Sequence, residues 1–459
     1  MPKKRAVPVD NAAAESDAEQ PAKRVRKTAA ADSTKPFPQP VSHPSHLKVP
    51  GDVFMLGTGD CGQFGLGEDV TEALRPNPSP LPGKKAIQIA ACGMHSIALV
   101  EDGSVWTTGV NDEGALGRFT DGQAWEKADV SKQGSAGDQS TWARVSFPSA
   151  AGRIVQVSGG DSHSAALDEH GTVFAWGTFR GDSGVFGFAP GTRIALLPTA
   201  VVQPTCADEQ VVRVVSGTDH ILALTNDGSV LSWGSGLVGQ LGRVGSRMQH
   251  PEETQLTPAA VPFKRTRGVK ASSKIVDIAA GPYTCFVCTD DGHVFAWGLN
   301  NYGQLGFASK APAYAPQLVK SLEGKKILEV GPGDHHTLAR TQDGQLLSFG
   351  RPTYGRLGRK DVDPASDDGC SVPASVDGLE GQHVHHMSAG SAVSSCIAGD
   401  NQDAYLWGFG DSSQLGKGDD DSDELVPLKL KETKRFSNRK VLQVEMGGQH
   451  VGLLAVIRS

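Results

Sequence analysis

Residues 158–187 read SGGDSHSAALDEHGTVFAWGTFRGDSGVFG, and this stretch contains one copy of a pattern that recurs along the chain. The copy begins with small residues and His163, continues through an apolar run to Gly171, and ends a second apolar run at Trp176-Gly177. Two short apolar runs joined through a glycine-containing turn predict a β-hairpin. Recurrence of such a unit along the chain is the sequence signature of a repeat architecture.

The glycine that follows the aromatic residue marks the same point in every copy. It stands at positions 57, 109, 177, 234, 298, 350 and 408, so the seven copies are spaced 52 to 68 residues apart. No single unit has enough core to fold alone, which argues against a string of small domains. Small antiparallel sheets repeated radially form a β-propeller. We therefore predict an all-β, seven-bladed propeller over residues 51–459, with two alternating strands in each unit.

The two ends of this region predict how the ring closes. The first copy begins at its second half, Val53-Phe-Met-Leu-Gly57, whereas the last copy stops after its first half, which contains Gly447-Gly-Gln-His450. One blade shared between the N- and C-terminal strands would complete both copies. One aromatic residue per repeat, at one register, is predicted to pack between the blades: Trp176, Trp233, Trp297, Phe349 and Trp407.

Residues 1–50 differ from the rest in composition and charge. They contain none of the 56 glycines and one aromatic residue, Phe37, so they are predicted to form a disordered tail. Their net charge is +4 against -7 for the whole chain, which leaves -11 for the body. Two basic clusters, Lys3-Lys4-Arg5 and Lys23-Arg24-Val25-Arg26-Lys27, suit an import receptor or phosphate backbones. The alternative is a solubilising terminus without partners.

Several function classes are disfavoured by the sequence. No run approaches the ~18 apolar residues of a membrane span, and no apolar signal segment follows the N-terminus. Seven scattered cysteines give no disulfide framework and fit a reducing compartment. Neither a P-loop nor a Rossmann glycine pattern occurs, and Cys285-Phe-Val-Cys288 lacks the second pair of a metal site. We expect no covalent catalysis, metal or cofactor.

Polar residues recur at the start of the first strand of most units. They are His95, Asp161 with His163, Asp219 with His220, Asp334 with His335 and His336, and Gln449 with His450. In a ring, equivalent positions converge on one face. The histidines either close turns by hydrogen bonding to backbone carbonyls, which we favour, or bind a partner. The aspartates are not required by the repeat, so they are interface candidates.

An insertion follows Trp176-Gly177 in place of the usual polar loop. It contains Phe179, Arg180, Gly181, Asp182, Ser183 and Gly184. We predict a projecting, glycine-hinged turn that carries an exposed arginine. Functional residues concentrate on such loops, so this turn strengthens the case for an interface on the same face.

Together these motifs resemble the regulator of chromosome condensation family, whose members are chromatin-bound guanine-nucleotide exchange factors for the small GTPase Ran. The resemblance rests on Gly-Asp-Ser-His163, Trp176-Gly-Thr-Phe-Arg180, Gln-Leu-Gly-Arg243-Val, Tyr354-Gly-Arg-Leu-Gly and Gly-Gly-Gln-His450, and it covers residues 51–459. It implies a nuclear, chromatin-associated protein that acts in nucleocytoplasmic transport and mitosis. Its implied partners are a Ran-like GTPase, histones of the nucleosome, DNA and a nuclear import receptor, without a membrane.

The resemblance also implies a set of site residues. The GTPase interface would include Asp60, Asp161, Asp219 and His335, and residues 179–184 would form a wedge that presses on the GTPase near its phosphate site. The alternative is a non-catalytic, chromatin-binding propeller scaffold of the same repeat family.

A basic insertion is a further candidate contact with chromatin. Residues 243–274 contain seven basic and two acidic residues on an otherwise acidic body. We predict Arg243 and Arg247 as chromatin contacts, with an ordinary solvated loop as the alternative.

Overall fold

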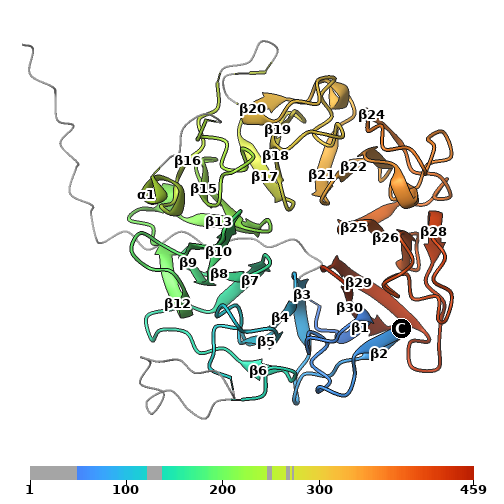
Figure 1. The fold of residues 1–459 in the computed structure, drawn as a ribbon, viewed down its shortest axis with the longest axis horizontal. Helices are drawn as coiled ribbons and strands as arrows, with labels where there is room; N and C mark the ends of the chain where they lie inside the picture. The colour runs from blue at the N-terminus through green and yellow to red at the C-terminus, as the bar shows by residue number, and fades with distance from the viewer. Residues whose placement is uncertain (1–48, 121–136, 246–250, 265–268, 271–272, 459) are drawn as a thin grey trace, which may run out of the picture. The chain divides into compact units, whose positions relative to one another are not determined.

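A computed structural model describes residues 49–120, 137–245, 251–264, 269–270 and 273–458. Within the compact unit of residues 37–459, these residues form seven four-stranded antiparallel sheets, which surround a central axis as blades (Figure 1). The predicted all-β, seven-bladed propeller is confirmed. The predicted tail falls outside the described residues except for its last two positions.

The blades follow one another around the ring in chain order. The four strands of each blade, from the axis outward, are as follows. Blade 1 contains β29 (Arg439–Met446), β30 (His450–Ile457), β1 (Asp52–Thr58) and β2 (Glu72–Pro78). Blade 2 contains β3 (Ala86–Ala91), β4 (His95–Val100), β5 (Val105–Gly109) and β6 (Ala143–Arg144). Blade 3 contains β7 (Ile154–Gly159), β8 (His163–Asp168), β9 (Val173–Gly177) and β12 (Ala195–Val202). Blade 4 contains β13 (Val211–Ser216), β14 (His220–Thr225), β15 (Val230–Gly234) and β16 (Ala259–Ala260). Blade 5 contains β17 (Ile275–Ala280), β18 (Thr284–Thr289), β19 (Val294–Gly298) and β20 (Ala313–Leu318). Blade 6 contains β21 (Ile327–Pro332), β22 (His336–Thr341), β23 (Leu346–Gly350) and β24 (Cys370–Ser375). Blade 7 contains β25 (Val384–Ala389), β26 (Val393–Ala398), β27 (Asp403–Gly408) and β28 (Glu424–Lys429).

The remaining elements are short and lie between these strands. A two-stranded hairpin of β10 (Phe179–Gly181) and β11 (Gly184–Gly187) follows β9. The helix α1 (Glu252–Leu256) precedes β16, and 3₁₀ turns of the described residues span Ala207–Glu209, Lys320–Leu322 and Thr353–Gly355.

The expectation of two strands per unit was wrong, because each blade has four. The predicted pair forms the second and third strands, such as β4 and β5. The inner strands escaped prediction because each contains a β-bulge that breaks the alternation, as between Ala86 and Gln88. Some outer strands are only two residues long, as in β6, and therefore carry no pattern.

The predicted shared blade is confirmed. β1 pairs with β30 over six registered positions, from Asp52 opposite Ala455 to Gly57 opposite His450. The N- and C-terminal strands thus hydrogen-bond to each other within one sheet, which closes the ring.

The recurring aromatic side chains are buried between blades, as predicted. The indole Nε1 of Trp176 donates to the carbonyl oxygen of Ala115 at 2.7 Å, and Nε1 of Trp297 donates to that of Gln240 at 2.7 Å. Both acceptors belong to the loop that closes the preceding blade with Leu-Gly. The tryptophan of one blade therefore ties down the loop of its neighbour while filling the core.

The repeat histidines are His95, His163, His220, His336 and His450, all of them buried. All except His163 join neighbouring blades, through partners that differ from those predicted. Nε2 lies 2.9 Å from Ser164 Oγ in the case of His95, and 2.7 Å from Ser394 Oγ in the case of His336. These partners are side chains of the next blade, not the backbone carbonyls that we expected. Burial lowers the pKa of His95 to about 4 and that of His450 to about 3, so these rings are neutral at physiological pH.

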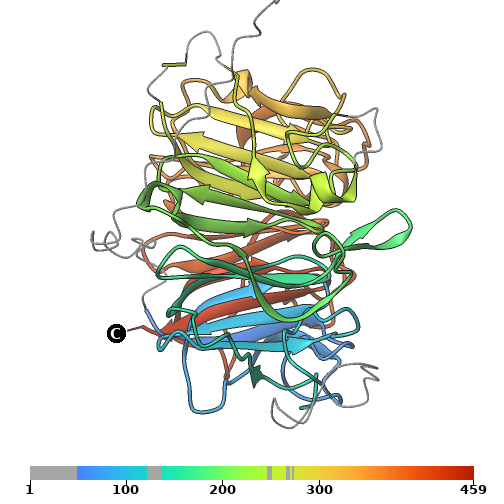
Figure 2. The same ribbon diagram turned by 90° about the vertical axis from the view of Figure 1, so that its left-hand side faces the viewer.

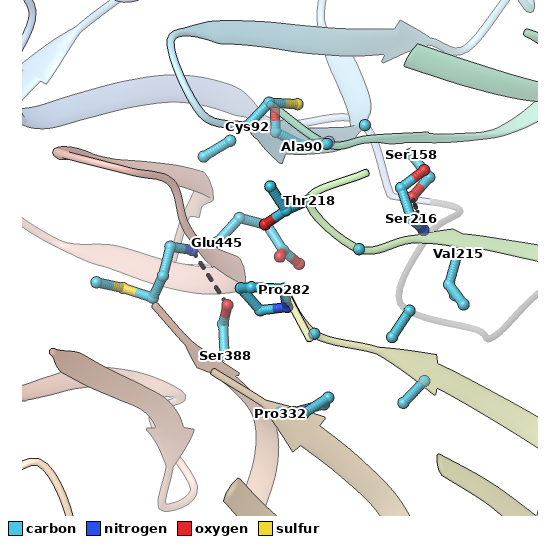
Figure 3. Close-up of a pocket in the computed structure, with 18 of the residues that line it drawn as sticks. Ala90, Cys92, Ser158, Val215, Ser216, Thr218, Pro282, Pro332, Ser388 and Glu445 are labelled. Atoms are coloured by element: carbon cyan, nitrogen blue, oxygen red, sulfur yellow. Dashed lines mark hydrogen bonds between the residues drawn. The ribbon is translucent and has the colours of Figure 1, made fainter. Parts of the chain in front are cut away.

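The inner strands line a central channel of about 1870 Å³ (Figure 3). In blades 1, 2 and 3 the bulge of the inner strand is followed by a glutamine that reaches the next blade. Gln88, Gln156 and Gln443 each accept and donate a hydrogen bond with one residue of the neighbouring inner strand, at 2.9–3.0 Å. Two serines of the inner strands also bond to the next blade. The Oγ atoms of Ser158 and Ser388 accept hydrogen bonds from the backbone N–H groups of Ser216 and Met446, respectively (Figure 3).

Candidate functional site

On one face of the ring, which we call the loop face, seven glycines allow the turns and loops of each blade to pack closely. It carries the turn before the second strand and the loop after the third strand of each blade, because these strand ends are paired, as His95 is with Gly109. The glycines that end the third strands have φ between +90° and +115°. A Cβ atom at Gly234 would lie 2.5 Å from the carbonyl oxygen of Asp219. A Cβ atom added at any of the other six glycines would lie 2.2–2.5 Å from a carbonyl oxygen in the turn before the second strand of the same blade.

The predicted projecting turn is the β10–β11 hairpin, which stands out from the loop face (Figure 2). Arg180 is exposed, as predicted, and Asp182 and Ser183 are exposed as well. Phe179, which we predicted at the interface, is instead fully buried. Its ring packs on His163 at 4.8 Å and on Phe188 at 6.4 Å between centroids, so it anchors the hairpin and does not present a surface.

Asp219 lies directly beside the base of this hairpin. Its Oδ1 accepts the backbone N–H of Arg180 at 2.7 Å. Burial, assisted by the charge of Asp161, raises the pKa of Asp219 to about 7 against the lowering effect of that hydrogen bond. Burial and the charge of Asp334 raise the pKa of Asp161 to about 6. The loop face thus holds two neighbouring carboxyls, Asp161 and Asp219, whose ionised forms are disfavoured, which is common at functional sites.

Asp219→Asn is expected to stabilise the protein above pH 7. Because the pKa of Asp219 is about 7 in the fold and about 4 in an unfolded chain, the native state binds more protons between these values. Stability from this residue therefore falls as the pH rises from 4 to 7. Asparagine removes the charge and keeps an oxygen for the Arg180 N–H. We expect a gain on the order of 2 kcal/mol at pH 8 and none at pH 4, measured by urea unfolding. An equal gain at both pH values would contradict the assignment.

His335 occupies an aromatic cluster on the same face. Its ring stacks on Tyr283 at 6.4 Å and meets the edge of Tyr302 at 5.0 Å, and the Arg351 guanidinium lies 4.7 Å above Tyr302. Burial lowers the pKa of His335. A neutral imidazole on a rigid aromatic platform suits recognition by packing and hydrogen bonding more than by charge.

The other predicted site residues lie apart from this group or outside the described chain. Asp60 is exposed in the loop of blade 1, two blades before the hairpin. Lys3, Lys4, Arg5, Lys23, Arg24, Arg26, Lys27 and Arg247 are outside the described residues.

Arg243 has a structural role that the sequence did not indicate. Its guanidinium donates to the carbonyl oxygens of Ser232, Thr254 and Thr257 at 2.8–3.3 Å, which clamps the outer part of blade 4. Arg118 and Arg359 do the same in blades 2 and 6. The basic residue after Leu-Gly is therefore part of the repeat, and a chromatin contact of Arg243 stays a prediction.

Sequence reasoning missed three residues of the loop face: Glu113, Tyr302 and Arg351. Glu113 forms an ion pair with Arg180, from Oε1 to Nη1 at 3.0 Å. All three stand in loops that follow a third strand, one to four positions after the glycine that ends it, and Arg180 stands three positions after Gly177 in the same kind of loop. Comparison of these loops across the repeats would have found them.

The junction between blades 3 and 4, beneath the hairpin, lacks hydrogen bonds found elsewhere in the ring. Trp233 Nε1 and both ring nitrogens of His163 are buried without a partner in the described part of the chain. The hairpin replaces the loop that would accept from Trp233, and Ile221 stands where other blades have a serine or cysteine for the histidine. Buried unpaired groups of this kind cost stability. Their presence here favours a functional reason for the hairpin.

No metal site is indicated within the described ranges. No group of three or more His, Cys, Asp or Glu side chains there is arranged to hold a metal ion. Cys285 and Cys288 are both buried on β18, as expected of packing residues, but Cys285 also joins blades 4 and 5. Its Sγ lies 3.0 Å from His220 Nε2 and donates to the carbonyl oxygen of Gln240 at 3.2 Å. No helix in the described part is long and apolar enough to pass through a membrane.

The sequence matches one known protein family over nearly the whole propeller. The model of the RCC1-like domain matches residues 52–453. The chain belongs to this family. The regulator of chromosome condensation of Mus musculus is 38% identical, over 90% of this chain and 93% of its own length. The guanine nucleotide exchange factor SRM1 of Saccharomyces cerevisiae is 34% identical, over 87% and 86%.

Solved structures of RCC1-like proteins are similar in fold. Prp20p from Saccharomyces cerevisiae, studied with its binding to Gsp1p and histones, has a TM-score of 0.76 at 31% identity, covering 92% of this chain and 94% of its own. Yeast RCC1 (Prp20) bound to Kap60 has a TM-score of 0.77 at 30% identity, covering 94% and 97%. The predicted family resemblance is confirmed.

Proposed function

We propose that this RCC1-like protein is a guanine-nucleotide exchange factor for a Ran-like small GTPase. The observation that carries the proposal is the β10–β11 hairpin, which projects from the loop face beside Asp161 and Asp219. The relatives named as regulator of chromosome condensation and as exchange factor SRM1 support it over nearly the whole propeller.

Exchange in this proposal requires no covalent chemistry. The factor binds the nucleotide-free GTPase more tightly than the loaded form, so by linkage it weakens nucleotide binding by the same factor. The hairpin would press on the region that holds the phosphates, Mg²⁺ and the switch segment. Carboxylates at Asp161 and Asp219 would attract basic residues of the GTPase and disfavour a nearby phosphate.

The further partners and the location are proposed on the same basis. The binding of Prp20p to histones and of Kap60 to yeast RCC1 supports a nuclear, chromatin-associated protein that binds histones and an import receptor. The basic clusters of the tail suit these acidic or phosphate-bearing partners. Roles in nucleocytoplasmic transport and mitosis would follow from exchange at chromatin.

A nucleotide-release assay tests the proposal. Catalytic amounts of the protein are expected to accelerate the release of labelled GDP from Ran. His335→Ala is expected to lower this acceleration about tenfold or more, the scale of an interface hot spot, while the unfolding midpoint stays nearly unchanged.

The matched control is His385→Ala. His385 bonds to the carbonyl oxygen of Gly399, in the turn at the other end of blade 7, so its loss should leave exchange unaffected. Partner capture without any effect of the wild-type protein on GDP release would instead support the chromatin-binding scaffold.

A further inference from the structure

Residue 180 is held from both sides by blades that flank its own. Its guanidinium pairs with Glu113 of blade 2 at 3.0 Å, and its backbone N–H donates to Asp219 of blade 4 at 2.7 Å. The Glu113 side chain is 19% exposed, compared with 49% for Arg180, so the carboxylate is the more fixed partner of the pair.

Apart from its base, where Phe186 packs against the core and Gly187 lies close to Leu256 of α1, the hairpin has few contacts that fix its direction. β10 and β11 form a sheet of their own and pair with no strand of blade 3. A Cβ atom at Gly184, near the tip, would meet nothing within 4 Å. Isolated two-stranded hairpins are marginally stable in water. The bulge between Phe179 and Arg180 separates the buried base from the first exposed residue.

We propose that Glu113 is a positioning residue for the hairpin, which acts with Asp219 to hold Arg180 and so aims β10–β11 away from the loop face. The proposal rests on the exchange activity proposed above. Phe179 fixes where the hairpin begins, and the two carboxyls of blades 2 and 4 fix how it leaves the ring. Glu113 therefore acts through Arg180.

The small energy of an exposed ion pair does not argue against this role. Such a pair contributes little to global stability. A hairpin that is already ordered, however, avoids the entropy cost of becoming ordered when the GTPase docks. A positioning residue supplies this pre-organisation. The effect should therefore appear in hairpin dynamics and in the turnover of exchange, with little change in the unfolding midpoint.

The first measurement uses the full-length protein without a GTPase. In Glu113→Gln, hydrogen–deuterium exchange of the peptide spanning residues 178–187 is expected to quicken about threefold to fivefold. Lys84→Met is the matched control, because it removes an ion pair of 2.8 Å with Asp102 at the other end of β4. Unchanged protection of the hairpin in Glu113→Gln would overturn the proposal.

The second measurement is GDP release from Ran. Glu113→Gln is expected to lower kcat about threefold to fivefold with KM nearly unchanged, since the rest of the loop face still binds. In an Arg180→Met background, Glu113→Gln should have no further effect, because it acts only through Arg180. A loosened hairpin with unaltered kcat, or equal effects in both backgrounds, would overturn the role. If the wild-type protein does not accelerate release at all, the proposed function fails, and the hydrogen-exchange result still decides whether Glu113 holds the hairpin.

Discussion

Replacement of Trp297 by alanine is expected to lower the free energy of unfolding by about 3–5 kcal/mol, the usual cost of removing a large buried aromatic residue. Trp297 is fully buried, and Phe263 contacts it edge-on at 5.9 Å between ring centroids. Its Nε1 also donates to Gln240 of the preceding blade. The substitution therefore opens a cavity at the junction of blades 4 and 5. Equilibrium unfolding in urea measures the loss.

A pair of phenylalanine variants separates the hydrogen bond from the packing. Trp297→Phe loses both ring volume and the bond to Gln240, whereas Trp233→Phe loses volume at the equivalent position, where Nε1 has no partner among the described residues. The Trp297 variant should be the less stable by about 1 kcal/mol. Equal costs at the two positions would show that the bond between blades contributes nothing.

Gly234→Ala is expected to damage both the fold and the site. The residue has φ of +112°, and the three nearest atoms to an added Cβ belong to Asp219, His220 and Phe179, at 2.5, 2.7 and 3.1 Å. Backbone strain and overlap together should lower the free energy of unfolding by about 3–5 kcal/mol. Because Asp219 and Phe179 hold the hairpin, GDP release from Ran should also fall.

Gly83→Ala provides the control for strain without overlap. Gly83 has φ of +64°, and nothing lies within 4 Å of its added Cβ. Its cost should be limited to the left-handed backbone, about 1–2 kcal/mol, with normal nucleotide release. Urea unfolding and the release assay are run on both variants. A Gly234→Ala protein no less stable than Gly83→Ala would contradict the contact of the loop face.

The ring could be predicted from sequence because its specification is local. Each of the seven marker glycines is required by one backbone angle and one close carbonyl, so it appears at every repeat. The Asp-Gly turns are local in the same sense, as at Gly103 with φ of +82°. The number of blades can therefore be counted from the positions of these glycines in the sequence, even when no contact between the blades is known.

The site could be predicted only in part, because its contacts are not local. Asp219 and Arg180 are 39 residues apart, and Glu113 is 67 residues from Arg180, so the three meet only when three blades are in place. The burial of Phe179 could not be predicted from the sequence, because it depends on packing against His163 and Phe188 in the fold. Likewise, the charge of Arg243 indicated a surface contact, whereas its carbonyl partners are 11 to 14 residues away in the same blade, and no sequence pattern marks them.

The shared blade makes the starting point of the propeller arbitrary. Asp52 lies opposite Ala455 on a neighbouring strand, so the two ends of the ring are about one strand spacing, roughly 5 Å, apart. A short covalent linker could join them, and the chain could then be cut in an exposed connection between two other blades. Such a circular permutant would retain every sheet, the hairpin and all seven junctions. The order of the blades along the chain can therefore be changed without a change in the blade architecture. A permutant could place the hairpin near a chain terminus while the ring stays the same.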